Sequence, residues 1–243
     1  MLILALDTTT RAGSLALTRD GRLLEVAEGD PGLTHAARLP GGILELLARH
    51  HLTLGDVDLY GVAVGPGSFT GLRIGIATIQ GLAFAHGRRV VGVSALDALA
   101  EAAGPVAADG DGAPVLRAAW MDAQRGEVYA RLYRRAGAVW LPVTEPIVAR
   151  PSAVLDAWSD GLGHGPVEFV GDGVMVYREQ ITEALGERAR PADEVPPLAP
   201  AIAFIAARDG EAGLAVAPDA IRPLYVRRPD AELARERKGQ GPR

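Results

Sequence analysis

The spacing of apolar residues over positions 1–98 predicts strands that alternate with helices. Short apolar runs bounded by turn residues are typical of strands; they cover residues 2–6, 14–18, 23–27, 59–64 and 89–93. Asp20-Gly21 lies between the second and third runs and is a strong hairpin signal. Longer runs predict helices over residues 35–50 and 71–86. Pro40-Gly41-Gly42 indicates that the first of these helices begins or kinks there.

The pattern changes beyond residue 98. Residues 101–114 are rich in Gly, Pro and Asp, which is typical of a boundary between lobes. Further strands are predicted over residues 115–121, 127–133, 139–141 and 167–170, with a turn over 134–138 and a helix over 199–208. We therefore expect an N-terminal lobe at 1–98 and a smaller C-terminal lobe at 99–227. We expect the helix near 199–208 to pack back on the first lobe and residues 228–243 to form a basic flexible tail.

Three meandering strands followed by alternating helices and strands imply an α/β fold in which a mixed sheet is flanked by helices. This order suits a lobe of the actin/Hsp70 type, which also has a ribonuclease H-like core. We expect two such lobes.

The predicted helix over residues 71–86 is apolar around nearly its whole circumference, and a helix of that kind is buried on all sides. The apolar positions are Ile74, Ile76, Ile79, Leu82 and Phe84. Gly71 and Gly75 lie four residues apart on one face, a spacing that allows a second helix to approach closely. Either this is a central helix in a two-lobed core, or it is a subunit interface. We favour the interface.

Composition removes several classes of chemistry. The 243 residues include no cysteine, and Lys238 is the only lysine, so disulfides, thiolate nucleophiles, lysine-bearing phosphate loops and lysine Schiff bases are excluded for the rest of the chain. The formal net charge of −5 argues against a protein that grips nucleic acid unaided. Apolar stretches fall short of the ~20 residues of a membrane span, and the N-terminus lacks the basic region of a signal peptide. We expect a cytoplasmic protein with no membrane contact.

The most specific motif runs from Gly65 to Gly75, with the sequence GPGSFTGLRIG, between a predicted strand and a predicted helix. Its first glycines suit a tight turn that needs a positive φ or a close backbone approach. Ser68 or Thr70 is placed to cap the helix that follows.

This motif resembles the signature of the TsaB (YeaZ) family, a group related to TsaD within the actin/Hsp70/sugar-kinase superfamily. Other segments agree in order: LALDTTT at the N-terminus, Thr34-His35, MDAQRGEVY from Met121, and PLYVR ending at Arg227. Gln124 stands where the family pattern has an arginine, with Arg125 beside it.

The resemblance implies a non-catalytic subunit that dimerises with a TsaD-like catalytic paralogue. With a TsaE-like ATPase, that assembly transfers threonylcarbamoyl to N6 of the adenosine next to the tRNA anticodon. It implies a homodimer when the chain is alone, and tRNA contact only through the complex. The expected interface residues are Gly71, Gly75, Ile76, Ile79, Leu82, Phe84 and His35.

Asp7 has two readings. At the end of a buried strand, it stands where the superfamily places a carboxylate near nucleotide-bound magnesium; alternatively, an Asp followed by threonines makes a side-chain-capped turn. A vestigial site with weak ATP or ADP and Mg affinity is the first reading. Its candidate residues are Asp7, Thr8, Gly65, Gly67, Ser68, Gly171 and Asp172.

No metal site is expected, because the five histidines do not form the H-x-x-x-H pair of the catalytic relative. The competing interpretation is a free-standing ATPase or small-molecule kinase of the same fold that uses Asp7 and the Gly65–Gly75 loop. A peptidase is disfavoured, since the chain has no cysteine, no paired histidine ligands and no G-x-S-x-G elbow.

Overall fold

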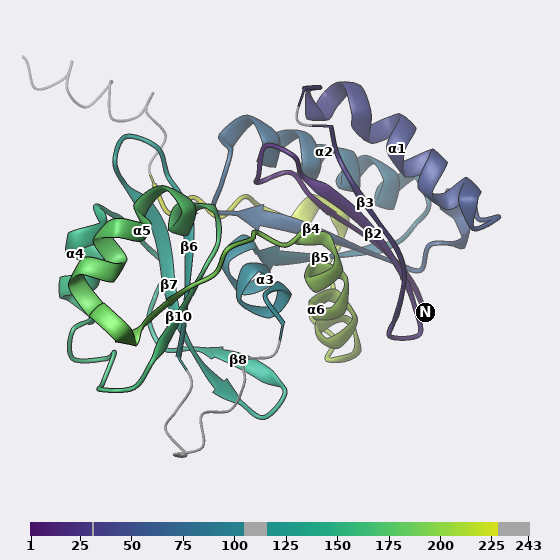
Figure 1. Cartoon of the computed structure of the whole chain (residues 1–243). Helices are drawn as coiled ribbons and strands as arrows, with labels where there is room; N and C mark the ends of the chain where they lie inside the picture. The colour runs from purple at the N-terminus through teal and green to yellow at the C-terminus, as the bar shows by residue number, and fades with distance from the viewer. Residues whose placement is uncertain (31, 105–115, 228–243) are drawn as a thin grey trace, which may run out of the picture.

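The computed structural model describes residues 1–30, 32–104 and 116–227, which form two β-sheets with helices between and around them (Figure 1). The first sheet has the strand order β3-β2-β1-β4-β5. Its strands are β1 (Leu2–Asp7), β2 (Ser14–Arg19), β3 (Arg22–Glu28), β4 (Leu59–Gly65) and β5 (Arg89–Ser94). β1, β2 and β3 pair antiparallel, whereas β1, β4 and β5 pair parallel, so the sheet is mixed as predicted.

The side chains of β1 alternate between two cores, because successive residues of a strand point to opposite faces. Leu2, Leu4 and Leu6 pack under α1 (His35–Arg49) and α2 (Phe69–Ala85). Ile3 and Ala5 pack on the other face, against α3 (Ala95–Ala102) and α6 (Ala199–Glu211). All of β1 is buried, which explains its unbroken apolar sequence.

The second sheet has the order β11-β10-β6-β7-β8, with β9 also paired to β7. Its elements are β6 (Leu116–Asp122), β7 (Val128–Ala136), β8 (Val139–Pro142), β9 (Ile147–Ala149), β10 (Val167–Val170) and β11 (Ala189–Pro191), with helices α4 (Pro151–Trp158) and α5 (Asp172–Leu185). Trp120 of β6 packs with Trp158 of α4 in the core beneath these helices. The opposite face of the sheet joins the core around α3 and α6, so these two helices lie between the sheets.

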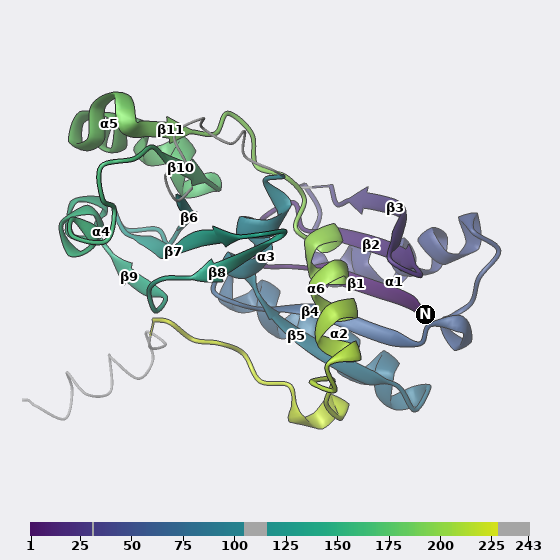
Figure 2. The same cartoon turned by 90° about the horizontal axis from the view of Figure 1, so that it is seen from below.

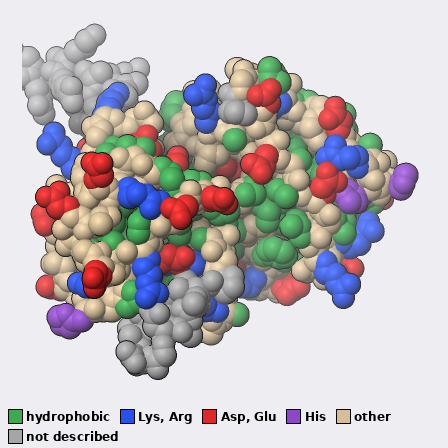
Figure 3. Space-filling view, in the orientation of Figure 1, with side chains coloured by type: hydrophobic (Ala, Val, Ile, Leu, Met, Phe, Trp, Pro, Cys, Tyr) green, Lys and Arg blue, Asp and Glu red, His purple; other side chains and the backbone are tan. Residues whose placement is uncertain are grey.

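Three short 3-10 turns, at Leu54–Asp56, Gly186–Arg188 and Pro218–Ala220, complete the described elements. Figure 3 shows hydrophobic side chains gathered over α6, where Phe204 is exposed. None of the described helices is long and apolar enough to cross a membrane.

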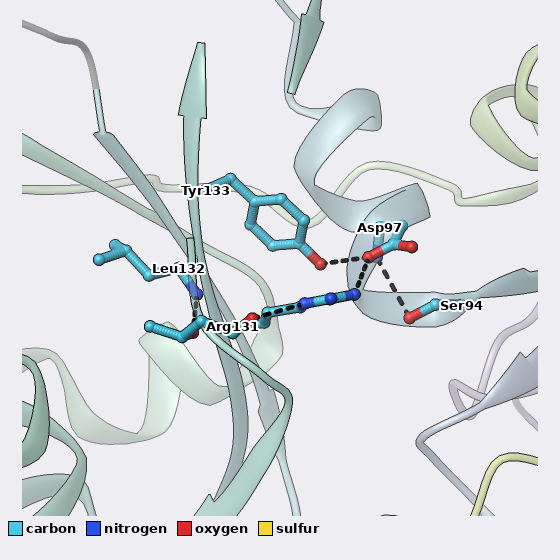
Figure 4. Close-up of polar contacts among 6 residues, drawn as sticks. Ser94, Asp97, Arg131, Leu132 and Tyr133 are labelled. Atoms are coloured by element: carbon cyan, nitrogen blue, oxygen red, sulfur yellow. Dashed lines mark hydrogen bonds and ion pairs between the residues drawn. The ribbon is translucent and has the colours of Figure 1, made fainter. Parts of the chain in front are cut away.

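Polar contacts also join the first lobe to the second at α3. Asp97 of α3 accepts hydrogen bonds from Tyr133 Oη (2.6 Å) and Arg131 Nη1 (2.9 Å) of β7 (Figure 4). Burial first, and then the Asp97 carboxylate, raises the pKa of the Tyr133 hydroxyl. On β6, the buried Arg117 pairs with Glu168 and donates to the carbonyl of Ala100 at the end of α3. α3 thus provides one covalent connection between the lobes as well as these hydrogen bonds.

The two-lobed α/β architecture is the one predicted, and the predicted strands and helices are present. The first helix covers His35–Arg49, as its predicted range of 35–50 has it, and it contains Pro40 rather than beginning at that residue. The predicted turn at 134–138 is shorter, because β7 continues to Ala136. Elements absent from the prediction are α3, α4, α5, β9 and β11. The expected boundary at residues 98 and 99 falls inside α3. Residues 105–114 and 228–243 lie outside the described part of the chain. The helix expected near 199–208 is α6, which contacts β1, β2 and β4 of the first sheet.

Candidate functional site

A cleft of about 930 Å³ lies between the two lobes. Its walls come from the turn after β1, the GPGSFTG turn before α2, the β6–β7 turn, the start of α5 and the C-terminal segment. The residues that carry its polar character are Thr9, Thr10, Arg11, His35, Ser68, Thr70, Asp122, Gln124, Arg125, Asp172, Tyr225 and Arg227.

Asp7 does not line this cleft. Its side chain is buried, with 1% of the residue exposed. Asp7 Oδ1 accepts from Thr9 N (2.7 Å) and Thr9 Oγ1 (2.5 Å), and Oδ2 accepts from Thr10 Oγ1 (3.0 Å). Burial raises the pKa of the Asp7 carboxyl, and the hydrogen bonds from Thr9 and Thr10 oppose that rise. The carboxylate therefore caps its own turn, the second of the two readings of this segment.

The space beside the glycines expected to cradle a nucleotide is occupied by other parts of the chain. A Cβ on Gly65 would lie 2.6 Å from the carbonyl oxygen of Leu224, and one on Gly67 would lie 2.5 Å from Cβ of Thr9. A Cβ on Gly171 would overlap the carbonyl oxygen of Trp120. These residues all have a positive φ, so their glycines serve close packing inside the protein rather than an open phosphate loop.

These residues do not fit a magnesium-bound nucleotide. Of the seven candidates, only Gly67, Ser68 and Asp172 line the cleft. Asp172 begins α5 and accepts a hydrogen bond from Asp122 N (2.9 Å). Thr8 is fully buried, and its Oγ1 has no hydrogen-bond partner among the described residues. Within residues 1–30, 32–104 and 116–227, no three His, Asp or Glu side chains are grouped to hold a metal ion. The kinase alternative consequently has no free carboxylate at the Asp7 position.

The second notable surface is the exposed side of α1 and α2, which cover the same face of the first sheet (Figure 1). Phe84 is 81% exposed and Leu44 is 55% exposed, although both are large apolar residues. Small residues of the same two helices are also exposed, and Gly41 and Gly81 have open space where a Cβ would lie. We call this surface the helix face; it consists of Ala36, Pro40, Gly41, Leu44 and Ala48 of α1 and Ala77, Gly81, Phe84 and Ala85 of α2.

Known proteins resemble this chain in sequence and in fold. A family model described as TsaD, tRNA N6-adenosine threonylcarbamoyltransferase, matches residues 32–235. The tRNA threonylcarbamoyladenosine biosynthesis protein TsaB of Escherichia coli strain K12 is 32% identical, over 93% of this chain and 95% of the relative. The chain belongs to the TsaB family.

Other TsaB-family proteins agree with this assignment. The protein of that name from Bacillus subtilis is 29% identical, over 77% of this chain and 78% of its own length. The crystal structure of YeaZ from Pseudomonas aeruginosa is 31% identical, with a TM-score of 0.75, and the alignment covers 92% of this chain and 99% of that structure. The resemblance seen in the GPGSFTGLRIG motif is therefore confirmed.

Most of the interface residues inferred from the TsaB resemblance point inward. Ile76 and Ile79 are 5% and 0% exposed and belong to the core under the sheet. A Cβ on Gly71 would overlap the Thr8 carbonyl oxygen, and one on Gly75 would overlap Thr8 Oγ1. The close approach at these glycines is thus to the chain's own β1 turn and not to another helix. Leu82 is partly buried, and Phe84 alone of the α2 residues in that set is exposed.

His35 is the first residue of α1 and lines the cleft. Its Nδ1 lies 2.7 Å from Nη2 of Arg38. Burial first, and the Arg38 charge second, lower the pKa of His35, so the neutral imidazole accepts from the guanidinium. His35 therefore contacts Arg38 within the first turn of α1, and it belongs to the wall of the cleft.

Two parts of the TsaB pattern have a structural role that sequence reasoning missed. Gln124, at the expected arginine position, has a φ of 60° and donates from Nε2 to Asp122 Oδ2 at 2.5 Å. Tyr225 and Arg227 of the closing PLYVR segment line the cleft. The only signal for the second was the motif itself, because their contacts join residues that are far apart in sequence.

Proposed function

We propose that this chain is an accessory subunit in the formation of threonylcarbamoyladenosine in tRNA and has no catalytic activity of its own. Membership of the TsaB family supports the pathway, since relatives bear that name. The state of Asp7 supports the accessory role, because its carboxylate is buried and committed to Thr9 and Thr10.

We infer that the helix face is the docking surface and that its partner is the TsaD-like catalytic paralogue. An 81% exposed phenylalanine beside small residues is the observation that carries this inference, because contiguous exposed apolar surface marks interaction sites. Gly41 and Gly81 would let backbones approach closely. The matching family model is that of TsaD, so the partner shares the fold and presents related helices. The same face pairs two copies when the chain is alone.

The ATPase and the tRNA join through that complex. The formal net charge of −5 supports this order of assembly, since phosphate neutralisation supplies most non-specific affinity for nucleic acid. A TsaE-like ATPase completes the set of proteins that the reaction needs.

Phe84→Asp tests the docking surface. A charge buried at the centre of the interface would weaken binding to the TsaD-like paralogue at least about 30-fold, the equivalent of about 2 kcal/mol for a hot-spot residue. Binding is measured by calorimetry with both purified proteins, and modified tRNA is measured in a reaction that also contains the ATPase. The expected result is a parallel loss of binding and of tRNA modification.

Phe204→Asp is the matched control, because Phe204 is a 44% exposed phenylalanine on α6, away from the helix face. It should leave both measurements unchanged. Unchanged binding by Phe84→Asp would show that the helix face is not the docking surface. Full tRNA modification without this chain would refute the accessory role itself.

A further inference from the structure

The C-terminal segment crosses from the first lobe to the second. Figure 2 shows it, in yellow, leaving the neighbourhood of α6 and passing to the side of the second sheet. Residues 224–227 form one wall of the cleft. We call these residues the strap.

The upstream end of the strap is fixed to the first lobe. Gln80 of α2 donates from Nε2 to the carbonyl oxygens of Pro218 (3.0 Å) and Ile221 (3.3 Å), just before the strap. Leu224 N then donates to Val64 O at 2.6 Å, at the end of β4. The carbonyl of Leu224 covers Gly65, which explains why that position has no side chain.

Tyr225 extends this attachment to the start of α2. Its ring lies 5.5 Å from the ring of Phe69, centroid to centroid. The Arg73 guanidinium lies 4.1 Å above the Phe69 ring, and Arg73 Nε is 3.4 Å from the Tyr225 hydroxyl oxygen. The strap thus packs against the GPGSFTG turn, the motif that defines this wall of the cleft.

The downstream end of the strap is fixed to the second lobe by one side chain. Arg227 Nη1 donates to the carbonyl oxygen of Ala123 at 2.7 Å, and Nη2 forms an ion pair with Glu127. The guanidinium also lies 5.6 Å from the centroid of the Tyr129 ring. Arg227 therefore binds the β6–β7 turn through its charge, its hydrogen bonds and its planar face at once.

We propose that the strap is an intramolecular ligand that holds the cleft at one fixed opening. The lobes are joined at α3 by the hydrogen bonds from Tyr133 to Asp97 and from Arg117 to the Ala100 carbonyl, and by the core around α3 and α6. A junction of packed helices still permits the hinge and shear motions that two-lobed proteins use around ligands. The strap adds a second connection across the cleft, and two separated connections block that motion.

The strap also covers backbone groups of both lobes along the wall of the cleft. Leu224 fills the space above Gly65, and Arg227 satisfies the carbonyl of Ala123 at the rim. The chain thus supplies from its own sequence the bridging contacts that a ligand would make between two lobes. This inference is independent of the docking proposal, because it concerns the isolated chain.

The distance between the lobes tests the strap directly. The sequence has no cysteine, so Glu211→Cys on α6 and Glu183→Cys on α5 place two spin labels and no others. Both positions are exposed, and α6 packs on the first sheet whereas α5 covers the second. Double electron–electron resonance then gives the distribution of distances between the two labels. Labelled chains are diluted into unlabelled ones so that pairs between copies do not contribute.

The parent protein should show one narrow distribution. Arg227→Ala should at least double its width or shift its maximum, and Glu127→Gln, which removes the same ion pair from the other lobe, should act in the same direction. Arg222→Ala is the matched control, since Arg222 donates to the carbonyls of Asp219 and Ile221 within its own segment. It should leave the distribution unchanged.

Circular dichroism establishes that each variant is folded before its distances are read. Folded Arg227→Ala and Glu127→Gln proteins whose distributions superimpose on that of the parent would overturn the proposal. An equal broadening in Arg222→Ala would also overturn it, because the effect would then not come from the bridge across the cleft.

Discussion

At the scale of single residues, the turn after β1 is held by its own hydrogen bonds and places no free carboxylate of Asp7 in the cleft. Asp7 is buried, and its oxygens accept hydrogen bonds from Thr9 and Thr10 rather than facing solvent. Thr8 fills the space beneath Gly71 and Gly75. The segment LDTTT is thus a packed and hydrogen-bonded support for the start of α2. A motif that elsewhere suits a magnesium ligand is used here for structure.

The raised pKa of Asp7 predicts how stability depends on pH. Between the ordinary Asp value of about 4 and the higher value in the folded protein, the folded state keeps a proton that the unfolded state has lost. The contribution of Asp7 to the free energy of unfolding therefore falls as pH rises through that window. Urea unfolding of the parent and of Asp7→Asn at several pH values from about 4 to 7 should show the parent losing stability relative to the variant.

Asp56→Asn should change the pH dependence of stability in the opposite direction. Hydrogen bonds from the backbone and hydroxyl of Thr53 lower the pKa of Asp56, so its contribution is present above the ordinary value and is lost as pH falls. The parent should therefore gain stability relative to Asp56→Asn as pH rises. Identical pH trends for the two substitutions would contradict the assignment of Asp7 as the buried, proton-retaining carboxyl.

At the scale of elements, α2 has glycines of two kinds. Gly71 faces the backbone of the β1 turn, whereas Gly81 faces open space on the helix face. Sequence spacing alone assigned Gly71 and Gly75 to an intermolecular contact, because a helix that is apolar all round gives no indication of which side its own chain covers. The side that carries Gly81 and Phe84 is exposed, and it is the side that we propose for that contact.

Alanine substitutions separate these two kinds of glycine. Gly71→Ala should destabilise the protein by about 1–3 kcal/mol, because the new Cβ overlaps the Thr8 carbonyl oxygen and a backbone atom cannot rotate away. Gly81→Ala meets no atom and should stabilise the helix by up to about 1 kcal/mol. Urea unfolding at one protein concentration measures both. A stabilised Gly71→Ala protein would show that the β1 turn does not support α2 as described.

The strands were predicted more completely than the helices of the second lobe. Strands such as β1 and β4 are short, apolar and bounded by turn residues, which is a local signal. α3 follows β5 without a loop, since Ser94 ends the strand and caps the helix, so no break marks its start. α5 begins within Gly171-Asp172-Gly173, a sequence that by itself is typical of a turn. The strap was not predictable at all, because Arg227 and Glu127 meet only through the tertiary fold.

At the scale of the whole molecule, the two lobes share one core. The cluster around α3 and α6 includes Ile3 and Val91 from the first sheet together with Met121 and Tyr133 from the second. Each lobe also has a core of its own beneath its outer helices. The shared cluster is the physical reason that a boundary drawn inside α3 divides the chain by topology but not by packing.

This shared core predicts that the lobes unfold together. Trp120 and Trp158 belong to the second lobe's own core and Trp140, on β8, to the shared cluster, so tryptophan fluorescence reports on the second lobe and its junction with the first. A fluorophore on Glu45→Cys, an exposed position of α1, reports on the first lobe. The two probes should give coincident urea transitions, as required for a cooperative two-state process.

Leu99→Ala makes the prediction sharper. Leu99 is 1% exposed in the shared cluster, and its truncation should cost about 2–5 kcal/mol. If the cluster couples the lobes, both probes shift to lower urea by the same amount, because the lost free energy belongs to one cooperative unit. If the outer cores stabilised each lobe separately, the two transitions would part in this variant, and α3 would be a linker between independent lobes rather than the centre of the fold.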